Sequence, residues 1–473
     1  MGAVRDFLGR RSLKVDDGRR TPAARLTLRE SIFPIALVTV LFFLWGFSYG
    51  LLDTLNKHFQ NVLHIDRARS SGLQAAYFGY EPRLPDALAM TPTLTSMNRR
   101  LTVSRAYPLA SVGHAAWILR HYGYRAAFIW GLSLYALGAL LAIAALKAHS
   151  FGGFCACIFI IGNGLGSLET AANPFIAVCG PARHSELRIN MSQAFNGVGS
   201  VVAPVFGSYL FFNFSDEHAL DNVQWVYLSI AVFVLLLAAA FFLAHIPEVT
   251  DADMALQAQE ANLETDDKPI WRQHRLLHAA FAQSPSPASS STVGRFAGVA
   301  LMRFVRPRLV LLAFLTCCIV FIGPAISAGG NAGVALLFVV LFFESICFPT
   351  ILALGMRGLG RHTKRGSGYI VAGVIGGAVG PPLTGYVGDR HGDGVAMVVP
   401  LCFFVAAWSY AVCVNFVPGY YTVIDSFGQA GEVAHAEADV ENPSSGSTEK
   451  VVESKSSPAS HHLASLDLPR SNN

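Results

Sequence analysis

The stretch GLGSLETAANPF, residues 164–175, places a carboxylate inside an apolar run that is long enough to cross a bilayer. Glu169 stands there among small residues, and a helix-breaking Asn173-Pro174 pair follows it. A carboxylate at the centre of a membrane helix costs about 3 kcal/mol on insertion scales. We therefore expect a chain that keeps one there to use it, most simply to bind a proton or a polar solute.

The composition is typical of a polytopic membrane protein. Of the 473 residues, 52% are hydrophobic and 14% are charged, whereas a soluble domain carries about 25% charge. The net charge of +4 is small and gives no reason to expect a nucleic-acid partner. The eight cysteines lack the spacing of zinc or redox sites. We expect neither a metal nor another cofactor.

Nine apolar segments are clear candidates for membrane-spanning helices, because each approaches or exceeds the roughly 20 residues that cross a bilayer. Five precede a polar central loop and four follow it. They lie at residues 32–59, 126–146, 151–178, 189–212, 225–244, 309–327, 334–355, 366–387 and 395–417.

The placement of lysine and arginine predicts the orientation. Basic residues gather in the N-terminal tail and in four connecting segments, and such segments stay on the cytosolic side. Both termini are therefore expected in the cytosol. The predicted order is a disordered cytosolic tail (1–30), a helical bundle (31–246), a cytosolic loop (247–275), a second bundle (276–419) and a disordered cytosolic tail (420–473).

Two places break this pattern. Nine spans cannot leave both termini on one side, and the missing crossing falls where apolar flanks at 71–80 and 106–119 surround a polar segment at 81–105. We hypothesise that this segment interrupts a former helix through mis-spliced or unspliced coding; the alternative is a genuine loop between two half-helices. At 279–305 a further span begins and stops, so that the first two spans of the second bundle are expected to be truncated.

Several motifs resemble the major facilitator superfamily and, within it, the fucose–galactose–proton symporter family. Besides residues 164–175, the matching pieces are FFLWGFSYGLLDTLNKHFQ (42–60), GYRAAFIWGLSLYALGALL (123–141), RINMSQAFNGVGS (188–200) and FPTILALGMRGLGRHTKRGSGYIVAGVIGG (348–377). The resemblance implies an all-α, polytopic fold of two bundles and twelve spans. This chain holds about nine to ten of those spans and is expected to be incomplete.

The resemblance also implies roles for individual residues. Asp53 is expected in proton coupling and substrate transport, Glu169 in sugar binding and protonation, and Gln193 at the sugar site. A sugar needs carboxylates and amides for its hydroxyls and an aromatic face for its ring. The expected polar set is Asp53, Asn56, Glu169, Asn173, Gln193 and Asn196, and the expected ring contacts are Trp45, Tyr49 and Phe195.

Other readings of these residues stay open. Asp53 could lie near the outer membrane surface, where hydration is cheap, and Glu169 could be a structural partner of a neighbouring helix. Asn196 fits a binding site and a contact between helices equally well, and Glu344 is either a pathway acid or a structural one. The family carries asparagines just before its first-helix aspartate, whereas this chain has residues 49–52 as YGLL, which leaves the sugar open.

The predicted function is proton-coupled symport of a monosaccharide, fucose-like or hexose-like, by alternating access. The alternatives are a sugar sensor that does not transport and a defective product of a transporter gene. No nucleophile–base pair or metal-ligand set indicates an enzyme. We expect a monomer in the plasma membrane whose partners are the sugar, the proton and the lipid bilayer.

Overall fold

The computed structural model describes residues 28–62, 109–148, 150–180, 184–211, 219–244, 246–250, 254, 269–283 and 291–426. In these ranges, the side chains at 53–62, 208–211 and 219–222, and at a few single positions, are outside the description. The predicted interruption at 81–105 also lies outside it. Every regular element in the described ranges is helical.

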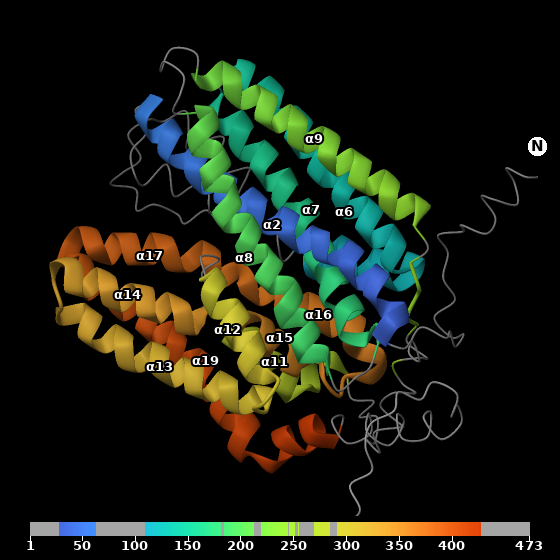
Figure 1. Cartoon of the computed structure of the whole chain (residues 1–473), viewed down its shortest axis with the longest axis vertical. Coiled ribbons are helices and arrows are strands. Elements are labelled where there is room, and N and C mark those ends of the chain that lie inside the picture. Colours follow the sequence, from blue (N-terminus) through green and yellow to red (C-terminus); the bar gives the residue numbers. More distant parts are fainter. Residues whose placement is uncertain are drawn as a thin grey trace, which may run out of the picture. The chain divides into compact units, whose positions relative to one another are not determined.

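Five long helices form the N-terminal half. Helix α6 packs against both α7 and α9, and α2 packs along α8 (Figure 1). The close approach of α2 and α8 requires glycine, because a Cβ added at Gly199 would collide with the backbone of Phe43 and Phe47. The helices are α2 (Leu28–Val62), α6 (Ala115–Lys147), α7 (Phe151–Val178), α8 (Ser185–Phe211) and α9 (Ala219–Leu243).

The basic segment at 120–125 is a sharp kink. A π-helical turn, η3 (Leu109–His114), leads into α6, whose axis breaks at Gly123 with φ +80° and ψ −174°. The carboxylate of Glu248 accepts hydrogen bonds from the backbone N–H groups of Tyr124 at 2.9 Å and Arg125 at 3.1 Å. Glu248 thus caps the part of α6 that follows the kink, where an anion is favoured by the helix dipole.

The C-terminal half contains shorter helices. Its first two regular helices have 9 and 11 residues, which is less than the roughly 20 needed to cross a bilayer. They are α11 (His274–Ala282), which follows the 3₁₀ turn η6 (Ile270–Arg272), and α12 (Thr292–Met302). Helix α12 packs against α8 of the first half as well as against its own half.

The remaining helices of this half differ in detail from the predicted spans. The span predicted at 334–355 is divided after Glu344, and the span predicted at 366–387 is divided by a 3₁₀ turn. Helix α13 packs against α14 and α19. The elements are α13 (Pro307–Ser327), α14 (Gly330–Glu344), α15 (Cys347–Met356), η7 (Gly360–His362), α16 (Thr363–Ala372), η8 (Gly373–Ile375), α17 (Gly376–His391), α18 (Asp393–Ala396) and α19 (Val398–Phe416).

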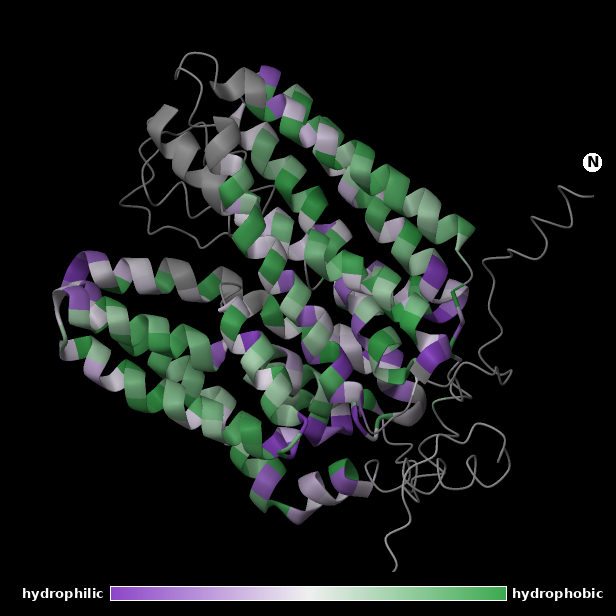
Figure 2. Ribbon diagram, in the orientation of Figure 1, coloured by the Kyte–Doolittle hydropathy of each residue, from purple (hydrophilic) through white to green (hydrophobic). Residues whose placement is uncertain are grey.

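The helices are apolar along their length and more polar at their ends. Figure 2 shows apolar residues along α9, α13 and α14, with hydrophilic residues gathered at helix ends. Seven candidate spans in the described residues are long and apolar enough to cross a membrane, judged by length and composition. Helix α8 is not among them, because it carries buried polar side chains. The all-helical, membrane-spanning fold predicted from the sequence is confirmed.

A short helical segment at 418–426 follows α19 and extends past the start of the tail predicted at residue 420. Asp425 in this segment lies 3.0 Å from Arg308 and 3.8 Å from Arg306. Arg357 donates to the carbonyl of Ile424 at 2.6 Å. These contacts fix residues that composition alone assigns to the disordered tail.

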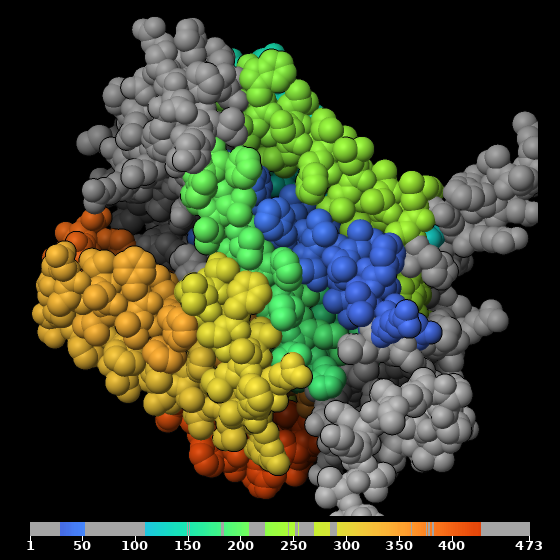
Figure 3. Space-filling model, viewed as in Figure 1, coloured from blue at the N-terminus to red at the C-terminus, as the bar shows by residue number. Residues whose placement is uncertain are grey.

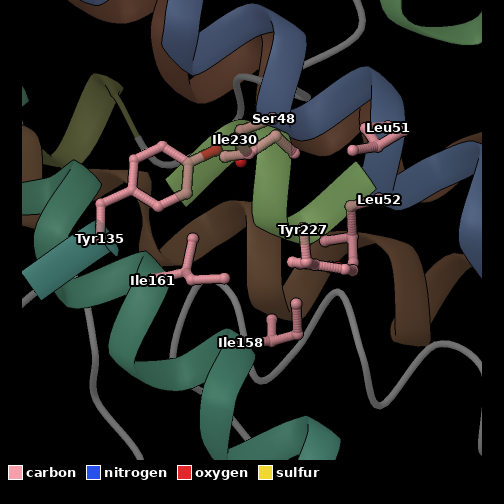
Figure 4. A pocket seen from close by; sticks show the side chains of 8 residues that line it. All are labelled: Ser48, Leu51, Leu52, Tyr135, Ile158, Ile161, Tyr227 and Ile230. Atoms are coloured by element: carbon pink, nitrogen blue, oxygen red, sulfur yellow. The ribbon is translucent and has the colours of Figure 1, made fainter. Parts of the chain in front are cut away.

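A small cavity lies inside the N-terminal half, between α2, α6, α7 and α9. It measures about 10 Å³, which is room for roughly one water molecule. Figure 4 shows the ring of Tyr135 reaching toward Ser48, and the rest of the lining is mostly aliphatic. The cavity is too small and too apolar to be a sugar site.

Candidate functional site

Glu169 lies on the inner face of α7. Its side chain is only 5% exposed, and it lies within electrostatic reach of Arg295 on α12. An arginine from the opposite half thus faces the carboxylate that the sequence singles out. A buried charge needs such partners, because burial in an apolar interior is otherwise costly.

The helix around Glu169 is modified by the Asn-Pro pair. The side-chain amide of Asn173, which is fully buried, donates to the carbonyl of Glu169 at 3.0 Å. Pro174 has no N–H and cannot donate to the carbonyl of Thr170 four residues earlier. The pair therefore leaves α7 with a backbone acceptor that is free for a neighbouring helix.

Helix α8 presents the two predicted amides to Arg295. One guanidinium nitrogen donates to the backbone carbonyl of Gln193 and lies 2.9 Å from Oδ1 of Asn196 and 3.5 Å from Oε1 of Gln193. All three side chains are buried. The structure thus brings Glu169, Gln193 and Asn196 together around one arginine that the sequence interpretation missed.

Glycines allow α12 to pack closely on its neighbours, which places Arg295 beside α8. A Cβ added at Gly197 of α8 would lie 2.9 Å from the Thr292 hydroxyl. A Cβ added at Gly294 would collide with the carbonyl of Phe342 on α14. Helix α12 is consequently in close contact with both α8 and α14, and Figure 3 shows its yellow residues lying against green α8 on the visible face.

Glu344 completes the charged cluster from the C-terminal half. It is the last residue of α14, its side chain is 5% exposed, and it lies within electrostatic reach of Arg295. Glu169 and Glu344 therefore face one guanidinium from opposite halves. Glu344 thus lies beside the candidate site, a position that fits both a pathway acid and a structural one.

The other predicted residues lie on α2 and α8. Asp53 and Asn56 lie near the end of α2, in the part whose side chains are outside the description. Trp45 is buried and Tyr49 is half-buried on the same helix. Phe195 is 42% exposed and packs edge-on against Phe296 of α12, the residue after Arg295, with ring centroids 6.4 Å apart.

Several buried polar atoms of the cluster lack hydrogen-bond partners within the part of the chain that the structure describes. Buried polar groups in native proteins are almost always paired, so each exception needs an explanation. Such atoms on α7, α8 and α14 are Asn173 Oδ1, Gln193 Nε2, Asn196 Nδ2 and Glu344 Oε1. Together they offer donors and acceptors to a small polar solute.

Polar contacts join the two halves at one end, which we term the ion-pair end. Arg357, just after α15, donates to the carboxylate of Glu186 on α8 at 2.6 Å. A second contact joins the same two helices: Asn190 of α8 donates to the hydroxyl of Thr350 of α15 at 3.3 Å. Lys364 on α16, almost fully buried, lies over the ring of Tyr124 at 5.6 Å.

Comparisons with known proteins agree with this architecture. The Major Facilitator Superfamily model matches residues 106–293. An L-fucose-proton symporter of Escherichia coli (strain K12) is 29% identical over 453 residues, covering 84% of this chain and 97% of that protein. A glucose/galactose transporter of Brucella abortus biovar 1 is 27% identical over 417 residues, covering 80% and 93%.

Solved structures show the same fold. The major facilitator transporter FucP, in the outward conformation, superposes with a TM-score of 0.62 at 28% identity and covers 80% of this chain and 98% of that one. A proton:xylose symporter, XylE, bound to 6-bromo-6-deoxy-D-glucose, gives a TM-score of 0.59 at 12% identity and covers 82% of this chain and 96% of that one. At this low identity the similarity supports the fold only.

The two-bundle helical fold is that of a membrane transporter, not of an enzyme. Its family match, its symporter relatives and its structural neighbour all show that the chain is similar to transporters of the major facilitator superfamily.

Proposed function

We propose that this chain carries a monosaccharide across a membrane together with a proton, by alternating access. The observation that carries the proposal is the set of unpaired buried polar atoms on α7, α8 and α14 within the described residues. A sugar hydroxyl both donates and accepts, so it pairs equally with the amide nitrogens of Gln193 and Asn196 and with the oxygen of Asn173.

The names of the relatives support the sugar class. The relatives above are an L-fucose-proton symporter and a glucose/galactose transporter. Both names describe hexose-sized, uncharged sugars, which suit a site that combines amides with carboxylates. The proposed substrate is therefore a fucose-like or hexose-like monosaccharide, with Trp45 and Tyr49 of α2 as candidates for ring contacts.

Proton coupling is proposed for the buried acids. Glu169 lies in a low-dielectric setting, where a carboxylate gains from binding a proton before the site closes around it. One proton that moves down a membrane potential of 100 mV supplies about 2.3 kcal/mol. This corresponds to roughly a fifty-fold accumulation of sugar, since each 1.4 kcal/mol is tenfold. Asp53 is proposed as the second acid of the pathway.

Alternating access is proposed to separate and rejoin the halves around this site. The contacts at the ion-pair end, Glu186 with Arg357 and Asn190 with Thr350, would hold one entrance shut. The basic residues at that end favour the cytosolic side. We accordingly propose cytosolic termini and, as the setting for nutrient uptake, the plasma membrane.

Uptake of radiolabelled L-fucose, D-galactose and D-glucose into proteoliposomes tests the function. We expect at least one sugar to accumulate when the outside is more acidic than the lumen. Glu169→Gln should abolish this accumulation, whereas Asp389→Asn, which neutralises an exposed acid on α17, should leave it intact. No sugar-dependent proton flux in the unaltered protein, or full accumulation by Glu169→Gln, would refute the proposal.

A further inference from the structure

Arg295 occupies the place that a sugar would need. Its guanidinium bonds to the backbone carbonyl of Gln193 and to the side-chain oxygen of Asn196. Both residues belong to the proposed sugar site, so the inference below rests on the proposed function. Sugar hydroxyls can bond to these amides fully only after the arginine has moved.

The charges around Arg295 supply a reason for it to move. A guanidinium stays charged at all ordinary pH values, and two carboxylates, Glu344 of the second half and Glu169 of the first, lie within its electrostatic reach. Two ionised acids and one arginine leave a net negative charge in a buried place, which is costly. Binding of one proton neutralises the cluster, and the arginine is then attracted to whichever acid is still ionised.

We propose that Arg295 couples the proton to the sugar: it covers Gln193 and Asn196 while Glu169 is ionised, and it turns to Glu344 when Glu169 binds a proton. The turn uncovers the two amides for sugar. Glu344 Oε1, which has no hydrogen-bond partner among the described residues, is available to receive the guanidinium. Proton binding thereby favours sugar binding, which is the linkage that symport requires.

The helices that pack on α7 also carry charged or titratable groups that bear on the surroundings of Glu169. Those helices are η3, α2, α6, α8, α15 and α16. Among their charged or titratable groups, His114 contacts Asn163, Arg188 contacts the carbonyls of Ile176 and Ala177, Tyr135 contacts Ser48 and Lys364 contacts Tyr124. Arg357, just after α15, contacts Glu186. Asp53 of α2 lies outside the description.

Two thiols also lie near Glu344. Helices α12, α13 and α15 pack against α14. Besides Arg295, they bring the thiols of Cys318 and Cys347 close to this carboxylate. Arg295 is thus a cation that both acids share, and it stands at the contact between the halves.

Sugar affinity measured against pH tests this role, with L-fucose, D-galactose and D-glucose as probes of the purified full chain. In the unaltered protein, affinity should fall about tenfold from pH 6 to pH 8, within the usual range of coupling between sites. Arg295→Gln should bind as tightly at pH 8 as at pH 6, because nothing covers the amides. Arg295→Lys keeps a charge and should keep a pH dependence of the same sign.

Glu344→Gln should act in the opposite direction. Without a second partner the arginine stays on α8, so affinity at pH 6 should fall about tenfold and lose its pH dependence. The double variant Arg295→Gln/Glu344→Gln should behave like Arg295→Gln alone. A purely structural ion pair gives a different pattern: both single variants lose thermal stability, and the pH profile of whatever still binds does not change.

Arg303→Gln is the matched control, because Arg303 is an exposed arginine at the end of the same helix; its affinity and pH profile should equal those of the unaltered protein. The coupling role is overturned if Arg295→Gln keeps the original pH profile, or if Glu344→Gln keeps the original affinity at pH 6. Absence of sugar binding by the unaltered protein at every pH overturns the transport function itself, and this inference with it.

Discussion

The hydroxyl of Ser367 on α16 donates a hydrogen bond of 3.1 Å to the carbonyl of Thr170 on α7. This carbonyl is the one that Pro174 leaves without its helical donor. The hydrogen bond that Pro174 removes from a helix of the first half is thus replaced by one from a side chain of the second half. The motif LETAANPF (168–175) was predicted from the sequence to belong to the binding site. It also provides a contact between the halves.

Removal of this hydroxyl should weaken the protein. We expect Ser367→Ala to lower the free energy of unfolding by about 1–3 kcal/mol, because a buried carbonyl loses its partner. In a Pro174→Ala background the restored N–H at position 174 satisfies that carbonyl, so the same substitution should cost less. Thermal unfolding in detergent of the four proteins in this cycle measures the difference. Equal costs in both backgrounds would show that Pro174 and Ser367 are not linked.

The kink in α6 should tolerate only glycine. Gly123→Ala would place a Cβ 2.5 Å from the carboxylate of Glu248 at a φ of +80°, and backbone strain of this kind costs about 1–3 kcal/mol. We expect a clear drop in the apparent melting temperature. Gly152→Ala is the control, because it lies in α7 with nothing within 4 Å of the added Cβ, and it should be neutral or slightly stabilising.

Stability should depend on pH through Glu248, which lies beyond the end of α9. Burial raises the pKa of Glu248 above its ordinary value of 4.5, although its backbone hydrogen bonds and the nearby Lys364 and Arg125 oppose the rise. The folded protein therefore holds this proton to higher pH than the unfolded chain. Its stabilising contribution is complete below about pH 4.5 and declines as the pH rises through the folded pKa.

Glu248→Gln cannot ionise and removes this decline. The melting temperature of the unaltered protein, minus that of Glu248→Gln, should become smaller as the pH rises from 4.5 toward neutrality. The exposed-acid variant Asp389→Asn should track the unaltered protein across the same series. A difference that grows with pH would mean that the backbone hydrogen bonds outweigh burial at this carboxylate.

The ion-pair end should open when Arg357 is neutralised. Arg357 and Glu186 are largely buried, and breaking a buried pair costs about 3–5 kcal/mol. Cys179 is fully buried at the end of α7, where Arg188 donates to the carbonyls of Ile176 and Ala177. We expect Arg357→Gln to raise the rate of maleimide modification at Cys179 about tenfold or more.

The reversed pair Glu186→Arg/Arg357→Glu should return the rate toward that of the unaltered protein. Arg390→Gln, which removes an exposed arginine on α17, serves as the control. Peptide-resolved mass spectrometry separates Cys179 from the exposed Cys402. An unchanged rate in Arg357→Gln would show that other contacts hold this end shut.

Long uniform segments could be predicted closely from the sequence. The span predicted at 151–178 coincides with α7 (Phe151–Val178), because a continuous apolar run there begins at a serine that caps the helix, with Ser150 accepting from the Gly153 N–H. The break after Glu344 could not be predicted in this way. The run at 334–355 is apolar apart from Glu344, Ser345 and Thr350, and it is long enough for one span. Its division coincides with close packing of Gly294 and Gly298 of α12 against Ser345 and Ile346.

The candidate site was predicted in part. An acid in an apolar run is easy to recognise, which singled out Glu169. The motif resemblance added Gln193, and Asn196 was added as an amide on the same helix face as Gln193. Arg295 was missed because its helix has only 11 residues and was read as the remnant of a span before a basic loop. The available signal was a single arginine within the apolar run GRFAGVALM at 294–302, since a lone charge in such a run seeks a buried partner.

The helical segment at 418–426 has a practical consequence for how the protein is produced and labelled. Its Ile424 carbonyl and its Asp425 carboxylate receive Arg357 and Arg308, respectively, and Arg357 in turn reaches Glu186 in the other half. A reporter or purification tag fused directly behind residue 419 would displace this segment and would disturb the entrance that the experiment sets out to observe. Fusions placed beyond residue 426, with a flexible spacer, leave these bonds in place.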